Sequence, residues 1–264
     1  MEVGNLGPEA YGAPLENAPE GRSGFSHFCL ADLGGGSFER CFIKLPEKQI
    51  EVINEITGYI LASAANQRVP ARAALIWVPI KSLPQPLPHW LKNVNQELWP
   101  AWCTSDEGVD SIKLYYSAEL RLVKDELKKS KESPFIVAFD DWIANNDRNI
   151  ENLLRLSEGH YSFIDHGRIL DWFDWRENAL GPGHESVNKV RLLLGDVADR
   201  LTFKSCAAGH AETFDEVYRA ARGILVDWWK MVDDDGQGCR NINAFLECRA
   251  ADKAGMKRRL GVLI

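Results

Sequence analysis

The chain lacks any hydrophobic run long enough to cross a membrane. A membrane-spanning helix needs about 20 consecutive apolar residues, and no stretch of the 264-residue sequence approaches that length. The opening residues 1–24 also lack the basic and apolar regions of a secretion signal. We therefore expect a cytoplasmic protein without a membrane partner.

Closely spaced cysteine pairs and internal repeats are also missing. The six cysteines are scattered along the chain, and no two of them form a Cys-x-x-Cys pair. This spacing is unlike a zinc site or a disulfide framework, so reduced thiols are the expectation.

An excess of positive charge is absent as well. The 31 Lys and Arg residues against 38 Asp and Glu residues give a formal net charge of −7. A protein that covers duplex DNA needs many cations to replace the condensed counterions, so direct nucleic-acid binding is not expected. The composition, 45% apolar and 10% aromatic, is that of an ordinary folded protein. The length suits one large domain or two small lobes.

The first part of the chain reads as a tail followed by strands and one helix. Residues 1–24 are rich in Gly, Pro, Ala and Glu without periodicity, which predicts a mobile or loosely docked tail. Two β-type runs, 25–30 and 38–45, flank a glycine-rich turn and predict a hairpin. Apolar residues at helical spacing over 48–67 predict a helix, and the apolar run 72–81 predicts a buried strand.

A proline-rich break at 80–90 separates this part from a mainly helical remainder. We therefore predict an α+β fold with two lobes: a small β-rich lobe over 25–85 and a larger, mainly helical lobe over 86–264. Helical apolar spacing marks five segments of the second lobe, namely 117–129, 133–145, 187–201, 213–231 and 242–260.

The residues with the clearest chemistry lie between 134 and 170. An apolar helix passes there into a polar loop that holds Asp147 and, five residues later, Asn152; Asp165 ends the next short strand. Such a set can surround a hydroxyl nucleophile and a metal-bound triphosphate. Asp147 would orient and deprotonate the hydroxyl, and Asn152 and Asp165 would hold Mg²⁺ through hard oxygen ligands.

This stretch resembles the catalytic and metal-binding segments of HipA-like kinases. The resemblance rests on the pattern N-x-D-R-x-x-x-N, from Asn145 to Asn152, followed by I-D-x-G from Ile164 to Gly167. Lipid kinases of the phosphatidylinositol kinase group share the layout more distantly. The resemblance implies a bilobal protein-kinase-like fold, the use of ATP and Mg²⁺, and phosphoryl transfer to a serine or threonine of a protein substrate. It also implies a toxin–antitoxin setting with an antitoxin-like partner.

The same resemblance assigns roles in the first lobe. Lys44 stands where family members carry the lysine that contacts nucleotide phosphates, and Glu55 stands where an ion pair would hold that lysine. The turn that includes Gly35, Gly36 and Ser37 would cover the phosphates through its backbone N–H groups. Ser37 is also a hypothetical autophosphorylation site. The turn lacks a full G-x-G-x-x-G pattern, which departs from a complete phosphate loop.

Other interpretations of these residues stay open. Asp147 and Asn152, taken singly, are typical of helix caps and turns. Arg148 is expected to stabilise the loop through Asp140 or Asp141. A lipid or small-molecule kinase is the enzymatic alternative, and a non-catalytic nucleotide-binding pseudokinase module is the alternative from another class.

Overall fold

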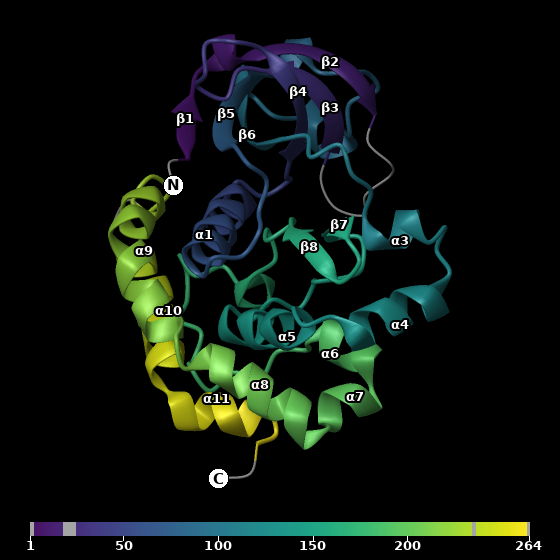
Figure 1. Ribbon diagram of the computed structural model, residues 1–264. Helices are drawn as coiled ribbons and strands as arrows, with labels where there is room; N and C mark the ends of the chain where they lie inside the picture. The colour runs from purple at the N-terminus through teal and green to yellow at the C-terminus, as the bar shows by residue number, and fades with distance from the viewer. Residues whose placement is uncertain (1–2, 18–24, 234–235, 263–264) are drawn as a thin grey trace. The chain divides into compact units, whose positions relative to one another are not determined.

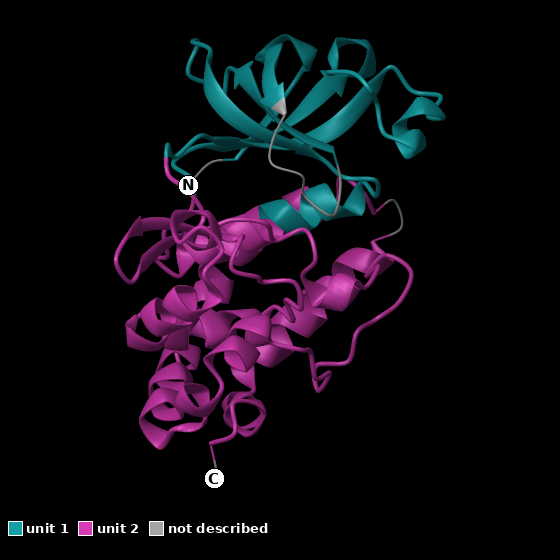
Figure 2. Ribbon diagram, turned by 90° about the vertical axis from the view of Figure 1, so that its right-hand side faces the viewer, with its two compact units in different colours: residues 1–56, 70–108 teal, residues 57–69, 109–264 magenta. Residues whose placement is uncertain are grey.

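A computed structural model describes residues 3–17, 25–233 and 236–262 of the chain (Figure 1). These residues form two compact units, unit 1 from residues 1–56 and 70–108 and unit 2 from residues 57–69 and 109–264 (Figure 2). Helix α1 (Ile50–Ala64) contributes to both units and carries both colours in Figure 2.

Unit 1 is built on a six-stranded sheet with the order β1-β5-β6-β4-β3-β2. Neighbouring strands are antiparallel except for β1 and β5, which run parallel. The strands are β1 (Gly4–Leu6), β2 (Tyr11–Asn17), β3 (Phe25–Ala31), β4 (Glu39–Leu45), β5 (Ala73–Pro79) and β6 (Leu98–Ser105). The short helices η1 (Pro8–Ala10), η2 (Ile80–Ser82) and α2 (His89–Lys92) lie in the connections.

The core of unit 1 consists of small and branched side chains from the central strands. Cys29, Cys41, Ile43 and Cys103 are all fully buried there. Residues from α2 and its flanks pack against the same core, and the Trp90 ring contacts the Trp99 ring at a centroid distance of 5.6 Å. All six cysteines are free thiols.

The sheet extends beyond what the sequence predicts. Part of the segment expected to be a tail forms β1 and β2, the two edge strands of the sheet. Pro14 is tolerated in β2 because an edge strand has a neighbouring strand on one side only, so a missing N–H on the other side leaves no acceptor without a donor. Residues 1–2 and 18–24 of that segment lie outside the described residues. Strand β6 lies in the part of the chain expected to be mainly helical, outside the five predicted helical segments. Its Pro100 lies opposite Trp77 of β5 and beyond the pairing with β4, so the missing N–H is not needed there.

Unit 2 contains the helices and a two-stranded hairpin, β7 (Leu153–Ser157) with β8 (His160–Phe163). The first three helices are α3 (Ile112–Tyr115), α4 (Leu120–Lys129) and α5 (Ser133–Trp142). After the short helix η3 (Leu170–Trp172) come α6 (Lys189–Leu194), α7 (Asp196–Asp199), α8 (Leu201–Ala211), α9 (Phe214–Trp229), α10 (Gln237–Ala251) and α11 (Lys253–Arg259).

Helix α5 is the central element of unit 2 and packs against α8 and α6 (Figure 1). Nine of its ten residues are buried. The Trp142 ring stacks on Phe214 at 4.7 Å between centroids, and Phe135 and Phe139 stack on each other at 5.5 Å. Because α5 is fixed on nearly all sides, the loop that follows it starts from a rigid base.

The predicted helices are present with some differences. The segment 242–260 is divided at Asp252 between α10 and α11. The segment 187–201 is broken at Gly195, whose φ of 55° and ψ of −126° favour glycine, so α6 and α7 are separate. Helix α8 was not predicted, because its buried side chains are the small Ala207, Ala208 and Ala211 and give a weak apolar pattern. The units also divide at residue 108, further along the chain than the predicted lobe boundary at 85.

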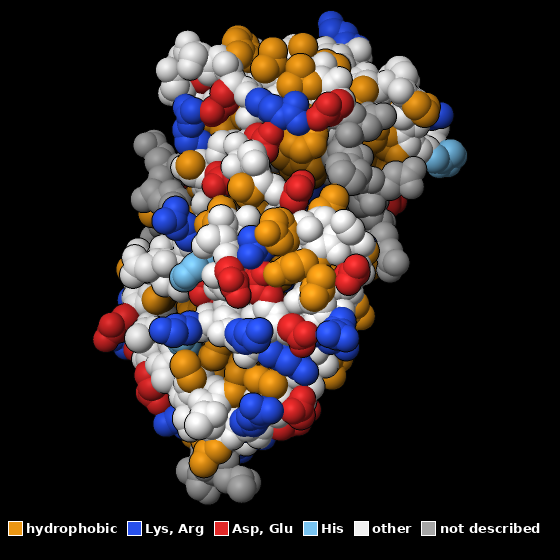
Figure 3. Space-filling model, turned by 45° about the vertical axis from the view of Figure 1, so that its right-hand side comes forward, with side chains coloured by type: hydrophobic (Ala, Val, Ile, Leu, Met, Phe, Trp, Pro, Cys, Tyr) orange, Lys and Arg blue, Asp and Glu red, His pale blue; other side chains and the backbone are white. Residues whose placement is uncertain are grey.

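The outer surface carries both signs of charge. On the face in Figure 3, Lys and Arg side chains alternate with Asp and Glu side chains. Within the described parts of the chain, every helix is too short or too polar to reach across a membrane.

Candidate active site

Lys44 and Glu55 form a buried ion pair within unit 1. Lys44 lies on β4, opposite Ser26 of β3 and Trp102 of β6, and Glu55 lies on α1. The Lys44 Nζ is 3.0 Å from the Glu55 Oε1, and the two side chains are only 8% and 2% exposed. The central position of β4 in the sheet therefore holds the ammonium group in one place.

The glycine turn of unit 1 directs its backbone N–H groups at an internal carboxylate. The amides of Gly34, Gly35 and Gly36 donate to the Asp32 Oδ1 at 2.9, 2.9 and 3.0 Å. The positive φ values of Gly34 and Gly36 allow three successive amides to converge on one oxygen. The turn thus has the form of an anion-binding loop, and the carboxylate that fills it comes from Asp32, which the sequence analysis missed.

In unit 2, the loop after α5 is organised by a buried Asp140–Arg148 pair. The Arg148 Nε lies 3.3 Å from the Asp140 Oδ1, and its Nη1 donates to the Ile164 carbonyl at 2.5 Å. The Asn145 side chain also donates to Asp140 and accepts the amide of Asp147. Arg148 therefore has the structural role expected for it, with Asp140 as its partner.

Burial dominates the charge balance at Asp140. The pKa of its carboxyl is raised from 3.8 to about 6 by desolvation, against the opposing effect of the Arg148 guanidinium and the Asn145 amide. The loop is therefore held in place by the Asp140 carboxylate, which is buried away from water.

The Asp147 carboxylate contacts two cations, neither of which the sequence analysis singled out. Its Oδ1 is 2.5 Å from the Lys189 Nζ at the start of α6, and its Oδ2 is 3.3 Å from the Arg168 Nη1. The guanidinium of Arg168 lies over the Trp172 ring at 4.5 Å. Arg168 follows the Ile164–Gly167 motif directly, whereas Lys189 is 42 residues from Asp147 and had no sequence signal.

The β7–β8 hairpin brings Asn152 beside the segment that carries Asp165. The Ile164 amide donates to the Asn152 carbonyl at 3.2 Å, and Asp165 is the next residue. The Asn152 Nδ2 donates to the Asp147 carbonyl at 3.1 Å. This bond fixes the orientation of the amide and leaves its oxygen as the group that can bind a cation.

An amide oxygen and a carboxylate are suitable donors for Mg²⁺, which is usually held by one or two protein side chains together with substrate phosphates. Among the described residues, no three His, Cys, Asp or Glu side chains form a cluster that could hold a metal ion. Asn152 and Asp165 supply one donor of each kind, an amide oxygen and a carboxylate.

Several residues around the loop have a left-handed backbone. Asp165 has a φ of 59°, and Leu170, Asp171 and Trp172 follow with 58°, 55° and 60°. The Asp171 amide donates to the Ala144 carbonyl at 2.7 Å, and its carboxylate accepts from Asn146 and from the His184 Nε2. Non-glycine residues in this region cost of order 1–3 kcal/mol each. Backbone strain is therefore concentrated next to the candidate catalytic loop.

His166, next to Asp165, packs against the backbone of α1. A Cβ placed on Gly58 would lie 2.3 Å from the His166 Cβ, so only glycine fits at this position. The His166 side chain is 2% exposed. The close approach fixes the residue beside Asp165 against the second half of α1.

The predicted residues thus fall into two groups. Unit 1 brings together Lys44 and Glu55, and it also contains the turn with Gly35, Gly36 and Ser37. Unit 2 brings Asn152 against Asp147 and next to the Asp165 segment.

Comparisons with known proteins agree with this fold. No protein-family model and no curated protein matches the sequence. Among solved structures, a proinflammatory kinase of Helicobacter pylori, CtkA, aligns with a TM-score of 0.53 and 10% identity over 93% of this chain and 95% of that chain. HipA of Shewanella oneidensis MR-1, in a complex with HipB and operator DNA, aligns with a TM-score of 0.47 and 12% identity over 94% and 70%. The likeness to CtkA confirms the predicted kinase-like α+β fold.

Proposed function

We propose that the protein is an ATP- and Mg²⁺-dependent kinase that transfers the γ-phosphoryl group to a serine or threonine of a protein. The observation that carries this proposal is the buried Lys44–Glu55 ion pair. Burying an ammonium and a carboxylate together costs several kcal/mol per ion in desolvation. Kinases maintain such a pair because it positions the lysine at the nucleotide phosphates.

Each residue then has a defined task. Lys44, held by Glu55, neutralises phosphate charge. Asn152 and Asp165 hold Mg²⁺, which, when bound, neutralises the charge that develops on the phosphates. Asp147 accepts the proton of the acceptor hydroxyl as its oxygen forms a bond to the γ-phosphorus. The bond from that phosphorus to the bridging oxygen breaks, and ADP leaves with the electron pair.

A second candidate is a nucleotide-binding module without phosphoryl transfer, and it has support of its own. Both oxygens of Asp147 are paired with cations, and the three turn amides are occupied by Asp32. A kinase must free Asp147 from Lys189 for each turnover, which the 45% exposure of the lysine side chain permits. An antitoxin-like partner, which the HipA-like resemblance implies, is a natural ligand for either candidate.

The test is phosphate transfer from Mg-ATP by the wild-type chain and by Asp147→Asn. The substitution should lower the rate by about 10²–10⁴-fold, the usual contribution of a general base. The control is Glu151→Gln on the same loop, whose side chain is 49% exposed and pairs with Lys113; its rate should match wild type. Equal rates in wild type and Asp147→Asn contradict the catalytic role, and nucleotide binding without turnover favours the second candidate.

A further inference from the structure

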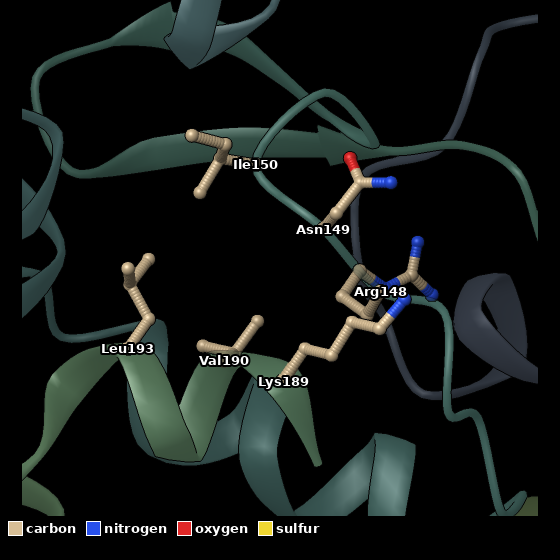
Figure 4. Close-up of a pocket in the computed structure, with 6 residues that line it drawn as sticks. All are labelled: Arg148, Asn149, Ile150, Lys189, Val190 and Leu193. Atoms are coloured by element: carbon tan, nitrogen blue, oxygen red, sulfur yellow. The ribbon is translucent and has the colours of Figure 1, made fainter. Parts of the chain in front are cut away.

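A small cavity lies beside the candidate catalytic residue Asp147, between the loop after α5 and helix α6 (Figure 4). Its volume is about 150 Å³. An apolar cavity of about this size in another protein binds benzene, so there is room for one aliphatic side chain. The lining residues are Arg148, Asn149, Ile150, Lys189, Val190 and Leu193.

The wall of the cavity is mainly apolar. Figure 4 shows the side chains of Ile150, Val190 and Leu193 directed into the space between the loop and the helix. Val190 is buried, whereas Ile150 and Leu193 keep part of their surface in water. A ligand that covers these two side chains gains from the hydrophobic effect.

Two of the residues that line the cavity are also direct neighbours of Asp147. Arg148, which lines the cavity, follows Asp147 directly, and Lys189 lines the cavity while its Nζ lies 2.5 Å from the Asp147 Oδ1. Consecutive Cα atoms of a peptide are about 3.8 Å apart. An acceptor residue with its hydroxyl at Asp147 therefore places the side chain of a near neighbour at the cavity.

The charges at this edge complement a carboxylate. Lys189 is 45% exposed and Arg168 25% exposed, and both contact Asp147. When an acceptor hydroxyl takes the place of these cations on Asp147, they are released toward the incoming chain. An acidic side chain on that chain gives them a partner.

We propose that this cavity selects the acceptor: a protein segment with one aliphatic residue close to the phosphorylated serine or threonine and an acidic residue nearby. The inference rests on the proposed kinase function and names its substrate class. The aliphatic side chain packs against Ile150, Val190 and Leu193. The carboxylate of the acidic residue pairs with Lys189 and Arg168.

The test uses the full chain, labelled Mg-ATP and peptide arrays with a fixed central serine. Each flanking position is set in turn to aliphatic, acidic, basic or amide residues, and label on the chain itself is measured separately. Aliphatic residues at one flanking position should raise incorporation by about tenfold or more over amides, the discrimination that one hydrophobic pocket supplies. Leu193→Gln should abolish this preference. Leu192→Gln should keep it, because Leu192 is 71% exposed on the same helix and does not line the cavity.

The outcomes separate the two claims. The inference is overturned if label is transferred to the chain or to peptides without a preference for aliphatic residues. It is also overturned if that preference is unchanged in Leu193→Gln. In both cases the kinase function still stands. Transfer to phosphatidylinositol vesicles in place of peptides overturns the inference and also the protein acceptor of the proposed function, and it leaves only phosphoryl transfer standing. Lys189→Ala should lower the enrichment of acidic residues, and equal use of acidic and basic flanks overturns the carboxylate part. If the wild-type chain labels nothing, the proposed function fails and the inference with it.

Discussion

At the scale of single residues, the candidate site is fixed by charges that have been taken out of water. Lys44 with Glu55 and Asp140 with Arg148 are both buried pairs. Replacing such a pair with apolar residues is often neutral or stabilising, so stability alone does not account for it. The pairs determine where a lysine and a loop lie, which is what a reaction that depends on positioning requires.

The Lys44–Glu55 pair can be tested by removing one charge or both. Lys44→Met leaves Glu55 buried beside an apolar group and should lower the free energy of unfolding by about 3–5 kcal/mol, the usual cost of breaking a buried pair. The double variant Lys44→Met, Glu55→Gln should recover most of that stability, measured by urea unfolding, yet stay inactive. Recovery of phosphate transfer along with stability is the result that contradicts a role for Lys44 at the nucleotide.

His27 gives a prediction about pH. It is fully buried on β3, where its Nε2 lies 2.8 Å from the Tyr11 hydroxyl, and burial lowers its pKa from 6.5 to about 4. Between these values the unfolded chain binds a proton that the folded chain does not, so this contribution to stability is complete above pH 6.5 and is lost as the pH falls toward 4.

The measurement is urea unfolding at about pH 7.5 and about pH 5. Because Asp140 titrates in both proteins, the prediction concerns their difference: on going to the lower pH, wild type should lose stability relative to His27→Asn. An identical pH dependence in the two proteins would show that His27 does not titrate as described.

At the scale of elements, helix α1 combines two duties. Glu55 pairs with Lys44, and Gly58, three residues later, meets His166 beside Asp165. Gly58→Ala forces a Cβ against the His166 Cβ, a backbone-proximal atom that cannot swing away. We expect a loss of about 1–3 kcal/mol in unfolding free energy, as for other overpacked sites, together with weaker Mg²⁺-dependent nucleotide binding.

Gly223→Ala on α9 is the matched control for this substitution. A Cβ at Gly223 has no heavy atom within 4 Å, so the change should stabilise the helix by about 0.5–1 kcal/mol. Thermal unfolding of both variants, with and without Mg-ATP, provides the comparison. A Gly58→Ala protein as stable and as responsive to Mg-ATP as wild type is incompatible with the tight packing of His166.

The elements predicted from the sequence are those with a strong local pattern. The β3–β4 hairpin, α1, β5, α5 and α9 each repeat apolar residues at the period of their structure. Strands β1 and β6 were missed because their place in the sheet depends on partners elsewhere in the chain, and β2 was missed although it pairs with β3, the next strand, because its register is irregular. Proline and glycine in these segments also indicated a loop when the sequence was considered alone.

The candidate site shows the same contrast between residues that a local sequence pattern indicates and residues that it does not. Asp147, Asn152 and Asp165 stand in a short motif whose spacing indicates them as candidate site residues. For Arg148 the sequence left two partners open, Asp140 or Asp141, and the structure pairs it with Asp140. Arg168 and Lys189 were missed because their contacts with Asp147 are tertiary and leave no spacing signal. Asp32 was missed although its contacts lie only two to four residues along the chain. The Asp32 carboxylate accepts from the amides of the turn that follows it, a local arrangement typical of aspartate in turns.

At the scale of the whole molecule, the proposed chemistry draws on both units. Lys44 and Glu55 belong to unit 1, whereas Asp147, Asn152 and Asp165 belong to unit 2. The central claim is that Lys44 acts on the phosphates of ATP and that Asp165 acts through Mg²⁺.

The most direct test is the dissociation constant of ATP, measured by calorimetry with and without Mg²⁺, for wild type, Lys44→Met and Asp165→Asn. Asparagine suits the test at position 165 because it tolerates the left-handed φ of 59°. We predict that Lys44→Met weakens binding in both conditions and that Asp165→Asn weakens only the Mg²⁺-dependent part. ATP affinity that neither substitution changes would contradict the account.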